Sequence, residues 1–223
     1  MISGRPLDEA NPILDTQLGI GNIRARIAII QRPLSADGMA YSIRRHRESP
    51  WTLPLFIKNR MLNPFAAGLL SFLIDGSRTL LVAGTRSSGK TSLLGSIMLE
   101  IVPKYRIIVI EDTLELPVES LRALQYNILR MKVRSALLKS GTEVSADDGI
   151  RTSLRLGDSS LIIGEIRSTE AEALYEAMRV GALANVVAGT IHGASSYGVF
   201  DRVVNDLKVP ATSFKATDII VVC

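Results

Sequence analysis

The sequence is poor in cysteine, in aromatic residues and in long apolar runs, and each shortage argues against one kind of structure or function. Its single cysteine, Cys223, leaves no intrachain disulfide and favours a reducing cytoplasm. No apolar run reaches the roughly 18 residues of a membrane-spanning helix, and residues 1–12 lack the apolar segment of a signal peptide. Aromatic residues make up only 5% of the chain, which is few for a surface that stacks nucleic-acid bases. The net charge of +4 is too small to indicate nucleic-acid binding by itself.

The rest of the composition is that of a folded, soluble chain whose two parts differ in pattern. Hydrophobic residues make up 47% and charged residues 22%. Residues 1–46 predict short strands at 14–18, 22–31 and 39–45, too few to bury much core alone. We expect them to be the C-terminal part of a smaller, β-containing N-terminal domain. Residues 47–58, which contain Pro50 and Pro54, predict an interdomain linker and a hinge.

Residues 59–223 predict an α/β domain. Expected helices at 64–74, 90–102, 169–180 and 199–207 alternate with apolar strands at 80–83, 107–110, 161–163, 186–190 and 219–222. This alternation is typical of a mostly parallel sheet covered on both faces, which binds ligands at the carboxyl ends of its strands. Because the chain stops at Cys223 beside an apolar strand, we expect this domain to be truncated at its C-terminus.

The most specific motif lies between Thr79 and Ser92. A strand runs into Gly84, four residues follow, and Gly89-Lys90-Thr91 completes the spacing G-x4-G-K-[ST] of a Walker A loop. Glycines let the backbone N–H groups face a phosphate, Lys90 places a charge on the β/γ-phosphates, and the Thr91 hydroxyl can ligate Mg²⁺. A chance turn is the alternative, but the strand before and the amphipathic helix after favour nucleotide binding. The predicted binding residues are Gly84, Thr85, Ser87, Ser88, Gly89, Lys90, Thr91 and Ser92.

Acidic residues and a histidine follow other predicted strands. The segment Glu111-Asp112-Thr113-Leu114-Glu115 follows the strand at 107–110, and Gly164-Glu165 follows the strand at 161–163. Carboxylates there can hold the waters of Mg²⁺ or orient an attacking water. Each acid taken singly is better explained as a helix cap or a surface charge, but together with the Walker loop they favour a functional site. His192 follows the strand at 186–190, where it either senses a γ-phosphate or an interface, or is structural.

The order of these motifs resembles one family. GTRSSGKT, IIVIEDTLELP, LIIGEIRSTEAEALYEAMRVGA and VAGTIHGASS are similar to the Walker A loop, Asp box, Walker B strand and His box of the ATPases of type II and type IV secretion, pili and archaella. The likeness covers about residues 20–223, and DRVVNDLKVPATSFKATDII resembles archaeal members most. It implies a RecA-like P-loop NTPase core that hydrolyses ATP with Mg²⁺ and drives secretion or filament assembly.

The resemblance also implies roles for individual residues. Its catalytic residues would be Glu115 as general base, supported by Glu111 and Asp112, with Glu165, Lys90, His192 and Arg167. Thr91 and Glu165 would serve the metal, and Glu111 and Arg44 would belong to the nucleotide-binding residues. Family members act as hexamers in which arginines reach the nucleotide, and further candidates are Arg24, Arg26, Arg45, Arg130, Arg134 and Arg155, each singly better explained as a surface or salt-bridge residue. The implied partner is a polytopic membrane platform protein, with the chain in the cytoplasm against the inner face of the membrane and no nucleic acid bound.

Some positions depart from the family pattern, and other functions stay open. Ser159, preceded by Asp158, stands where the family has Asp before the Walker B strand, and Ser168 replaces an Asp common after Gly-Glu-x-Arg. A nucleic-acid translocase or helicase is one alternative, since residues 130–134 form a basic cluster that also fits an edge strand. A nucleotide-binding subunit without turnover is the other.

Overall fold

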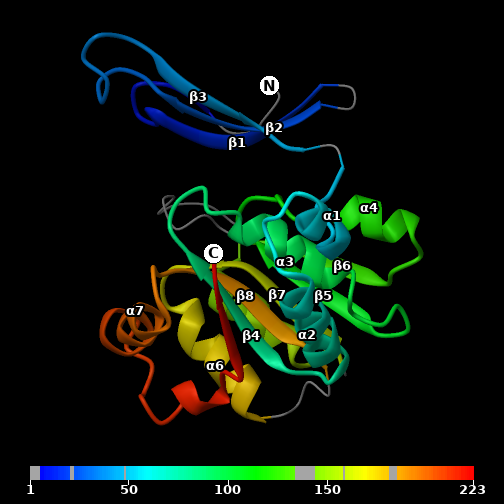
Figure 1. Ribbon diagram of the computed structural model, residues 1–223. Helices are drawn as coiled ribbons and strands as arrows, with labels where there is room; N and C mark the ends of the chain where they lie inside the picture. The colour runs from blue at the N-terminus through cyan, green and yellow to red at the C-terminus, as the bar shows by residue number, and fades with distance from the viewer. Residues whose placement is uncertain (1–5, 21–22, 48, 134–143, 158, 181–184) are drawn as a thin grey trace. The chain divides into compact units, whose positions relative to one another are not determined.

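A computed structural model describes residues 6–20, 23–47, 49–133, 144–157, 159–180 and 185–223 (Figure 1). Contacts within the chain divide it into two compact units, residues 1–49 and 50–223. None of the helices in the described residues is both long and apolar enough to span a membrane.

The first unit is an antiparallel sheet with the strand order β1-β2-β3. Strand β1 (Ile13–Ile20) pairs with β2 (Ile23–Ile30), and β2 pairs with β3 (Ala40–Arg45). Arg26 on β2 donates two hydrogen bonds to the Asp15 carboxylate, at 3.0 and 2.6 Å. Every residue of β3 is exposed, Arg44 among them. The strands expected at 14–18, 22–31 and 39–45 are thus confirmed within a residue or two.

The second unit is built on a parallel sheet with the strand order β6-β5-β7-β8-β4-β9. Its strands are β4 (Thr79–Gly84), β5 (Arg106–Glu111), β6 (Ile128–Lys132), β7 (Ser159–Ile166), β8 (Val187–His192) and β9 (Ile219–Val222). Leu80, Leu81, Val82 and Ala83 of β4 are all fully buried, because a strand at the centre of such a sheet is covered on both faces. The mostly parallel α/β fold expected from the sequence is confirmed.

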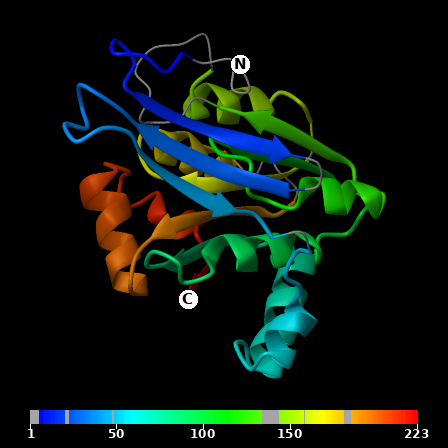
Figure 2. The same cartoon turned by 90° about the horizontal axis from the view of Figure 1, so that it is seen from above.

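Helices cover both faces of this sheet (Figure 2). One apolar cluster joins the sheet to α1 (Leu53–Lys58), α2 (Pro64–Asp75), α3 (Lys90–Met98) and α4 (Val118–Ala123). The cluster on the other face joins it to α5 (Ala146–Ser153), α6 (Glu170–Val180) and α7 (Ser196–Asp201), which continues as a π-helical turn over Arg202–Asp206. A short 3-10 turn, Phe214–Ala216, precedes β9.

Several short elements were not expected from the sequence. Residues 53–58, assigned to the linker, form helix α1, in which Leu53 and Phe56 are buried. Its proline stands in the first turn, where a missing N–H costs nothing, and the Thr52 hydroxyl accepts a hydrogen bond from Leu55 N at 3.2 Å. Helices α4 and α5 and strand β6 were also missed as elements, although β6 is the edge strand considered for residues 130–134. Helix α3 ends at Met98, four residues before the expected end at 102.

Candidate nucleotide-binding site

The strand register brings the predicted site residues of the second unit to one edge of the sheet. Gly84, the last residue of β4, pairs with His192, the last residue of β8. Ile110 on β5 pairs with Ile163 on β7, so Glu111 and Gly164, the next residues along each strand, follow at the same level. The ends of β4, β8, β7 and β5 thus carry the Walker loop, the histidine and the acids.

The loop after β4 has the backbone that a phosphate cradle requires. Gly84 has φ +156°, and a Cβ there would lie 2.3 Å from Ser88 Oγ, so no larger residue fits. Ser87 and Gly89 also have positive φ, at 62° and 96°. Gly89 precedes α3, and no side chain caps the helix N-terminus, which leaves its first N–H groups for an anion. The Ser88 hydroxyl is buried without a hydrogen-bond partner in the structure.

Lys90 is the first residue of α3, and its side chain reaches back into this loop. Its side chain is largely buried, and Nζ donates a hydrogen bond of 2.5 Å to the Thr85 carbonyl oxygen. Thr91 and Ser92, in the first turn of α3, are partly exposed. The ammonium group is therefore held at the bend of the loop backbone, from which it could bind a phosphate oxygen.

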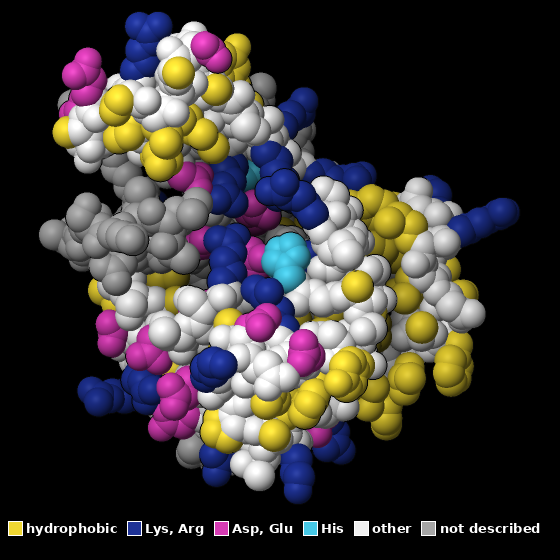
Figure 3. Space-filling model, turned by 90° about the vertical axis from the view of Figure 1, so that its left-hand side faces the viewer, with side chains coloured by type: hydrophobic (Ala, Val, Ile, Leu, Met, Phe, Trp, Pro, Cys, Tyr) yellow, Lys and Arg dark blue, Asp and Glu magenta, His cyan; other side chains and the backbone are white. Residues whose placement is uncertain are grey.

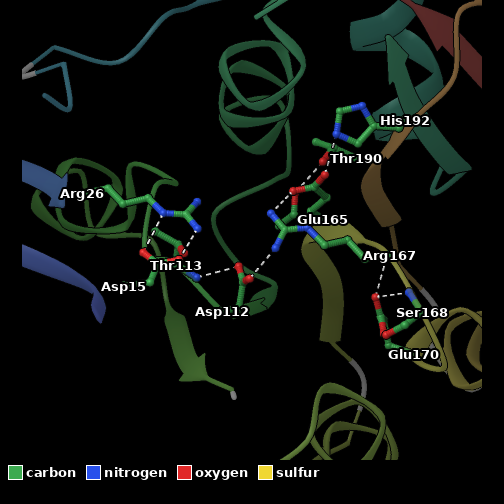
Figure 4. Close-up of polar contacts among 11 residues, drawn as sticks. Asp15, Arg26, Asp112, Thr113, Glu165, Arg167, Ser168, Glu170, Thr190 and His192 are labelled. Carbon is green, nitrogen blue, oxygen red and sulfur yellow. Dashed lines mark hydrogen bonds and ion pairs between the residues drawn. The ribbon is translucent and has the colours of Figure 1, made fainter. Parts of the chain in front are cut away.

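Glu165 is held between two cationic or hydrogen-bonding partners (Figure 4). Its Oε1 lies 2.9 Å from His192 Nε2, and its Oε2 pairs with the Arg167 guanidinium. Burial raises the pKa of Glu165, but the Arg167 hydrogen bond and charge, with His192 and Lys90, outweigh it and hold the pKa below its usual value. The carboxylate is therefore ionised at neutral pH, and the charge of Lys90 contributes to this.

Arg167 connects β7 to the segment after β5. Besides Glu165, it donates a 2.7 Å hydrogen bond to Asp112 Oδ2. The turn that carries Arg167 is fixed by Glu170, whose Oε1 accepts hydrogen bonds from Arg167 N and Ser168 N at 2.5 and 2.9 Å. Sequence reasoning missed Glu170; its position, three residues after Arg167 and in the first turn of α6, is the signal that could have revealed it. Figure 3 shows acidic and basic side chains gathered around an exposed histidine on one face.

Glu111, expected to contact the nucleotide, contacts the protein itself. Its Oε1 accepts hydrogen bonds from Glu115 N and Leu116 N, at 2.8 and 2.7 Å. Its Oε2 lies 3.2 Å from Arg130 Nε. Burial raises the pKa of Glu111 to about 7, against the lowering effect of the Leu116 amide and of Arg130. These contacts argue against a direct nucleotide contact and assign Glu111 to the loop that carries Glu115.

The remaining predicted residues lie elsewhere. Glu115 is partly buried on the loop between β5 and α4. Arg44 belongs to the first unit, so its predicted contact with the nucleotide stays a prediction. Arg134 and Asp158 lie outside the described residues. Ser159 begins β7, at the end opposite Glu165, and its buried hydroxyl has no hydrogen-bond partner in the structure.

The described residues contain no group of three His, Cys, Asp or Glu side chains that could hold a metal ion. Mg²⁺ does not need such a cage, because it keeps several waters and binds one or two protein groups together with substrate phosphates. Thr91 beside the cradle and the ionised Glu165 fit that pattern. The residues present are therefore compatible with a magnesium–triphosphate ligand.

Comparison with known proteins identifies the family. The family model described as "Type II/IV secretion system protein" matches residues 12–223. The chain belongs to this family. It is 28% identical over 195 residues to a putative conjugal transfer protein of Mycobacterium tuberculosis, covering 86% of this chain and 53% of the relative. It is 25% identical over 213 residues to the type IV secretion system protein PtlH of Bordetella pertussis, covering 86% and 60%.

A solved structure shares the fold of this secretion-family chain. The VirB11 ATPase of the Brucella suis type IV secretion system superposes with a TM-score of 0.58 and 20% identity, over 98% of this chain and 72% of that one. At this identity the likeness shows the fold alone, which is the RecA-like core expected from the sequence. The chain spans about half the length of the first curated relatives it matches.

Proposed function

We propose that this chain is the ATP-hydrolysing part of a motor for type II/IV secretion or for pilus or archaellum assembly, which converts hydrolysis into domain movement. The observation that carries the proposal is the meeting of the Walker loop, with Lys90 inside it, and the ionised Glu165 paired with His192 at one sheet edge. Family membership supports the same reaction.

Each residue has a definable part in that reaction. Lys90 would exchange the Thr85 carbonyl for β- and γ-phosphate oxygens, and α3 would direct its N-terminal N–H groups at the same anion. Thr91 and Glu165 would hold Mg²⁺, directly or through its waters; the ion supplies neutralisation of phosphate charge when bound. Glu115 would accept the proton of the attacking water, and His192 would lie near the γ-phosphate.

Arg167 and His192 would orient Glu165. Both carboxylate oxygens of Glu165 are engaged, one by each partner. A carboxylate held on two sides has one orientation, and an oriented group costs little reorganisation when charge develops in the transition state. Arg167 would thus act first on Glu165 and through it on the reaction.

The assembly is proposed on family grounds. We infer a homo-oligomer, a hexamer in the full-length protein, that works from the cytoplasm against a polytopic membrane platform protein. Movement about the hinge expected at residues 47–54 would bring arginines such as Arg44 to the nucleotide.

Two substitutions test the function. Lys90→Ala should abolish ATP binding in calorimetry with Mg²⁺, whereas Glu115→Gln should bind ATP normally and lose hydrolysis. Arg78→Ala, which removes a positive charge ahead of β4 and outside the site, is a matched control for the lysine. Full turnover by Glu115→Gln would remove Glu115 from the role of general base, and a folded wild-type chain that failed to bind ATP would end the proposal.

The alternatives are separated by two further measurements. Arg130, from the basic cluster of the helicase alternative, is buried against Glu111 and so does not offer its charge to a nucleic acid. Stimulation of phosphate release by single-stranded DNA would nonetheless favour the helicase. A subunit without turnover would release no phosphate at any protein concentration, whereas a motor with shared sites gains specific activity as concentration rises.

A further inference from the structure

The loop that carries Glu115 is anchored by a buried ion pair, Glu111 with Arg130, that has no part in the proposed reaction. The Glu111 and Arg130 side chains are 1% and 12% exposed. Glu111 Oε1 accepts the Glu115 and Leu116 N–H groups, and one terminal nitrogen of Arg130 donates to the Leu116 carbonyl oxygen at 2.6 Å. The peptide groups on both sides of Leu116 are therefore bound by one charged pair.

Two glycines show how closely this pair and its loop are fitted. A Cβ on Gly164, the residue before Glu165, would lie 3.0 Å from Glu111 Cγ, so the glutamate side chain passes directly over β7. A Cβ on Gly95 of α3 would lie 3.1 Å from Pro117 Cδ, so the loop also rests on the helix that follows the phosphate cradle. The loop is thereby located with respect to both the Walker helix and the Walker B strand.

The burial and pairing of the Glu111 and Arg130 charges favour a structural role for these residues over ligand binding. Arg130 Nε and Glu111 Oε2 form an ion pair at 3.2 Å, although neither atom has a hydrogen-bond partner. An exposed acid on α4, Glu119, lies 3.6 Å from another nitrogen of Arg130. Truncating one member of a buried pair leaves the polar groups of the other without a partner, so each side chain depends on the hydrogen-bonding groups of the other to keep its place.

We propose that Glu111 and Arg130 are positioning residues that hold the backbone at 115–116 and so set the place of the Glu115 carboxylate. The inference rests on the proposed role of Glu115 as general base. A general base must lie within hydrogen-bond reach of the water it deprotonates, and a displacement of about 1 Å costs on the order of 100-fold in rate. Loss of this pair should therefore lower kcat while nucleotide affinity, which depends on the Walker loop, stays the same.

Two substitutions of Glu111 separate positioning from charge. Glu111→Gln and Glu111→Met both remove the charge, but only glutamine keeps an oxygen that accepts the two N–H groups. We expect Glu111→Met to lower kcat at least about tenfold with KM changed less than about twofold, and Glu111→Gln to retain most of the rate. Lys132→Met is the control and should match the wild type, because Lys132 lies opposite Glu111 on the neighbouring strand β6 but its side chain is exposed.

A second measurement does not depend on catalysis. Hydrogen exchange of the Glu115 and Leu116 amides should speed up at least about tenfold in Glu111→Met but not in Lys132→Met, because those N–H groups lose their acceptor. If Glu111→Met does not fold, Arg130→Lys keeps the positive charge but cannot reach both the carboxylate and the Leu116 carbonyl, and should show the same kcat loss.

The outcomes are distinguishable. Wild-type kcat and wild-type exchange in both Glu111→Met and Arg130→Lys would overturn the positioning role. Full activity of Glu115→Gln together with fast exchange in Glu111→Met would instead overturn Glu115 as the base and leave the holding of the loop in place.

Discussion

Strands β5 and β7 are neighbours, and each carries a glutamate at its carboxyl end, but the two glutamates lie in opposite environments. Glu111 is 1% exposed at its side chain, faces backbone amides and has its pKa raised to about 7. Glu165 is 19% exposed at its side chain, faces Arg167 and His192, and has its pKa lowered. Desolvation is the largest single influence on both pKa values; at Glu111 the Leu116 amide and Arg130 do not offset it, whereas at Glu165 Arg167, His192 and Lys90 together outweigh it. Similar strand-end glutamates can therefore hold a loop or face a ligand.

The largest expected difference between them is in catalysis. Glu165→Gln should lower kcat about 100-fold or more, because it removes a charge from the reacting region, whereas Glu111→Gln should change kcat only slightly. Steady-state phosphate release with saturating ATP and Mg²⁺ measures both. Equal losses of kcat in the two variants would show that the two glutamates do not differ in their contribution to catalysis.

The dependence of stability on pH should have opposite sign for the two residues. Between pH 4.5 and about 7, folded Glu111 keeps a proton that the unfolded chain has lost, so its contribution to stability falls as pH rises, on the order of 3 kcal/mol. The contribution of Glu165 is instead present above its unfolded pKa and is lost as pH falls through the folded value.

Chemical unfolding from about pH 2.5 to 8 checks this expectation, because the loss at Glu165 falls below its unfolded pKa of 4.5. In Glu111→Gln the free energy of unfolding should decline less than in the wild type as pH rises toward neutral. In Glu165→Gln it should decline less than in the wild type as pH falls into the acidic range. Arg130 and the nearby acids Glu115 and Glu119 also face Glu111, so Glu119→Gln serves as the background for comparison. A Glu111→Gln curve parallel to that of the wild type would contradict the raised pKa.

A smaller effect is expected at Thr190 on β8, which binds the neighbouring strand β7 one residue before Glu165. Its hydroxyl donates a 2.6 Å hydrogen bond to the Gly164 carbonyl oxygen. Thr190→Val keeps the shape and removes the donor, and should cost about 1 kcal/mol of unfolding free energy. Thr190→Ser should recover most of it in the same denaturant titration; no difference between valine and serine would exclude the hydrogen bond as the cause.

The smallest effect is expected at Glu119. Its side chain is 48% exposed and lies 3.4 Å from Arg122 and 3.6 Å from Arg130. Exposed pairs contribute little, so Glu119→Gln should change unfolding free energy by less than about 0.5 kcal/mol and leave kcat unaltered. A large loss of kcat would mean that Glu119, rather than Glu111, is the important partner of Arg130.

Much of this architecture could be predicted because it depends on local patterns. The apolar runs at 80–83, 107–110 and 161–163 became central strands, and the glycine spacing of the Walker loop predicted its turn. The contacts that set the two glutamates apart could not be predicted. Glu111 is paired with Arg130, 19 residues later in the chain, and Glu165 is in contact with His192 only in the folded protein. Neither pairing leaves a signal in a single sequence. Helix α1 was missed because its proline was interpreted as a linker signal.

Parallel pairing of Gly84 with His192 has a mechanical consequence. Two strands joined by a continuous ladder, about 4.8 Å apart, cannot slide without breaking every bond between them, so the backbone of His192 is fixed next to the start of the Walker cradle. Glu115 belongs to no ladder. Within this sheet edge, β4 and β8 therefore act as a fixed frame, to which the loop at 112–117 is joined only by side-chain and turn contacts.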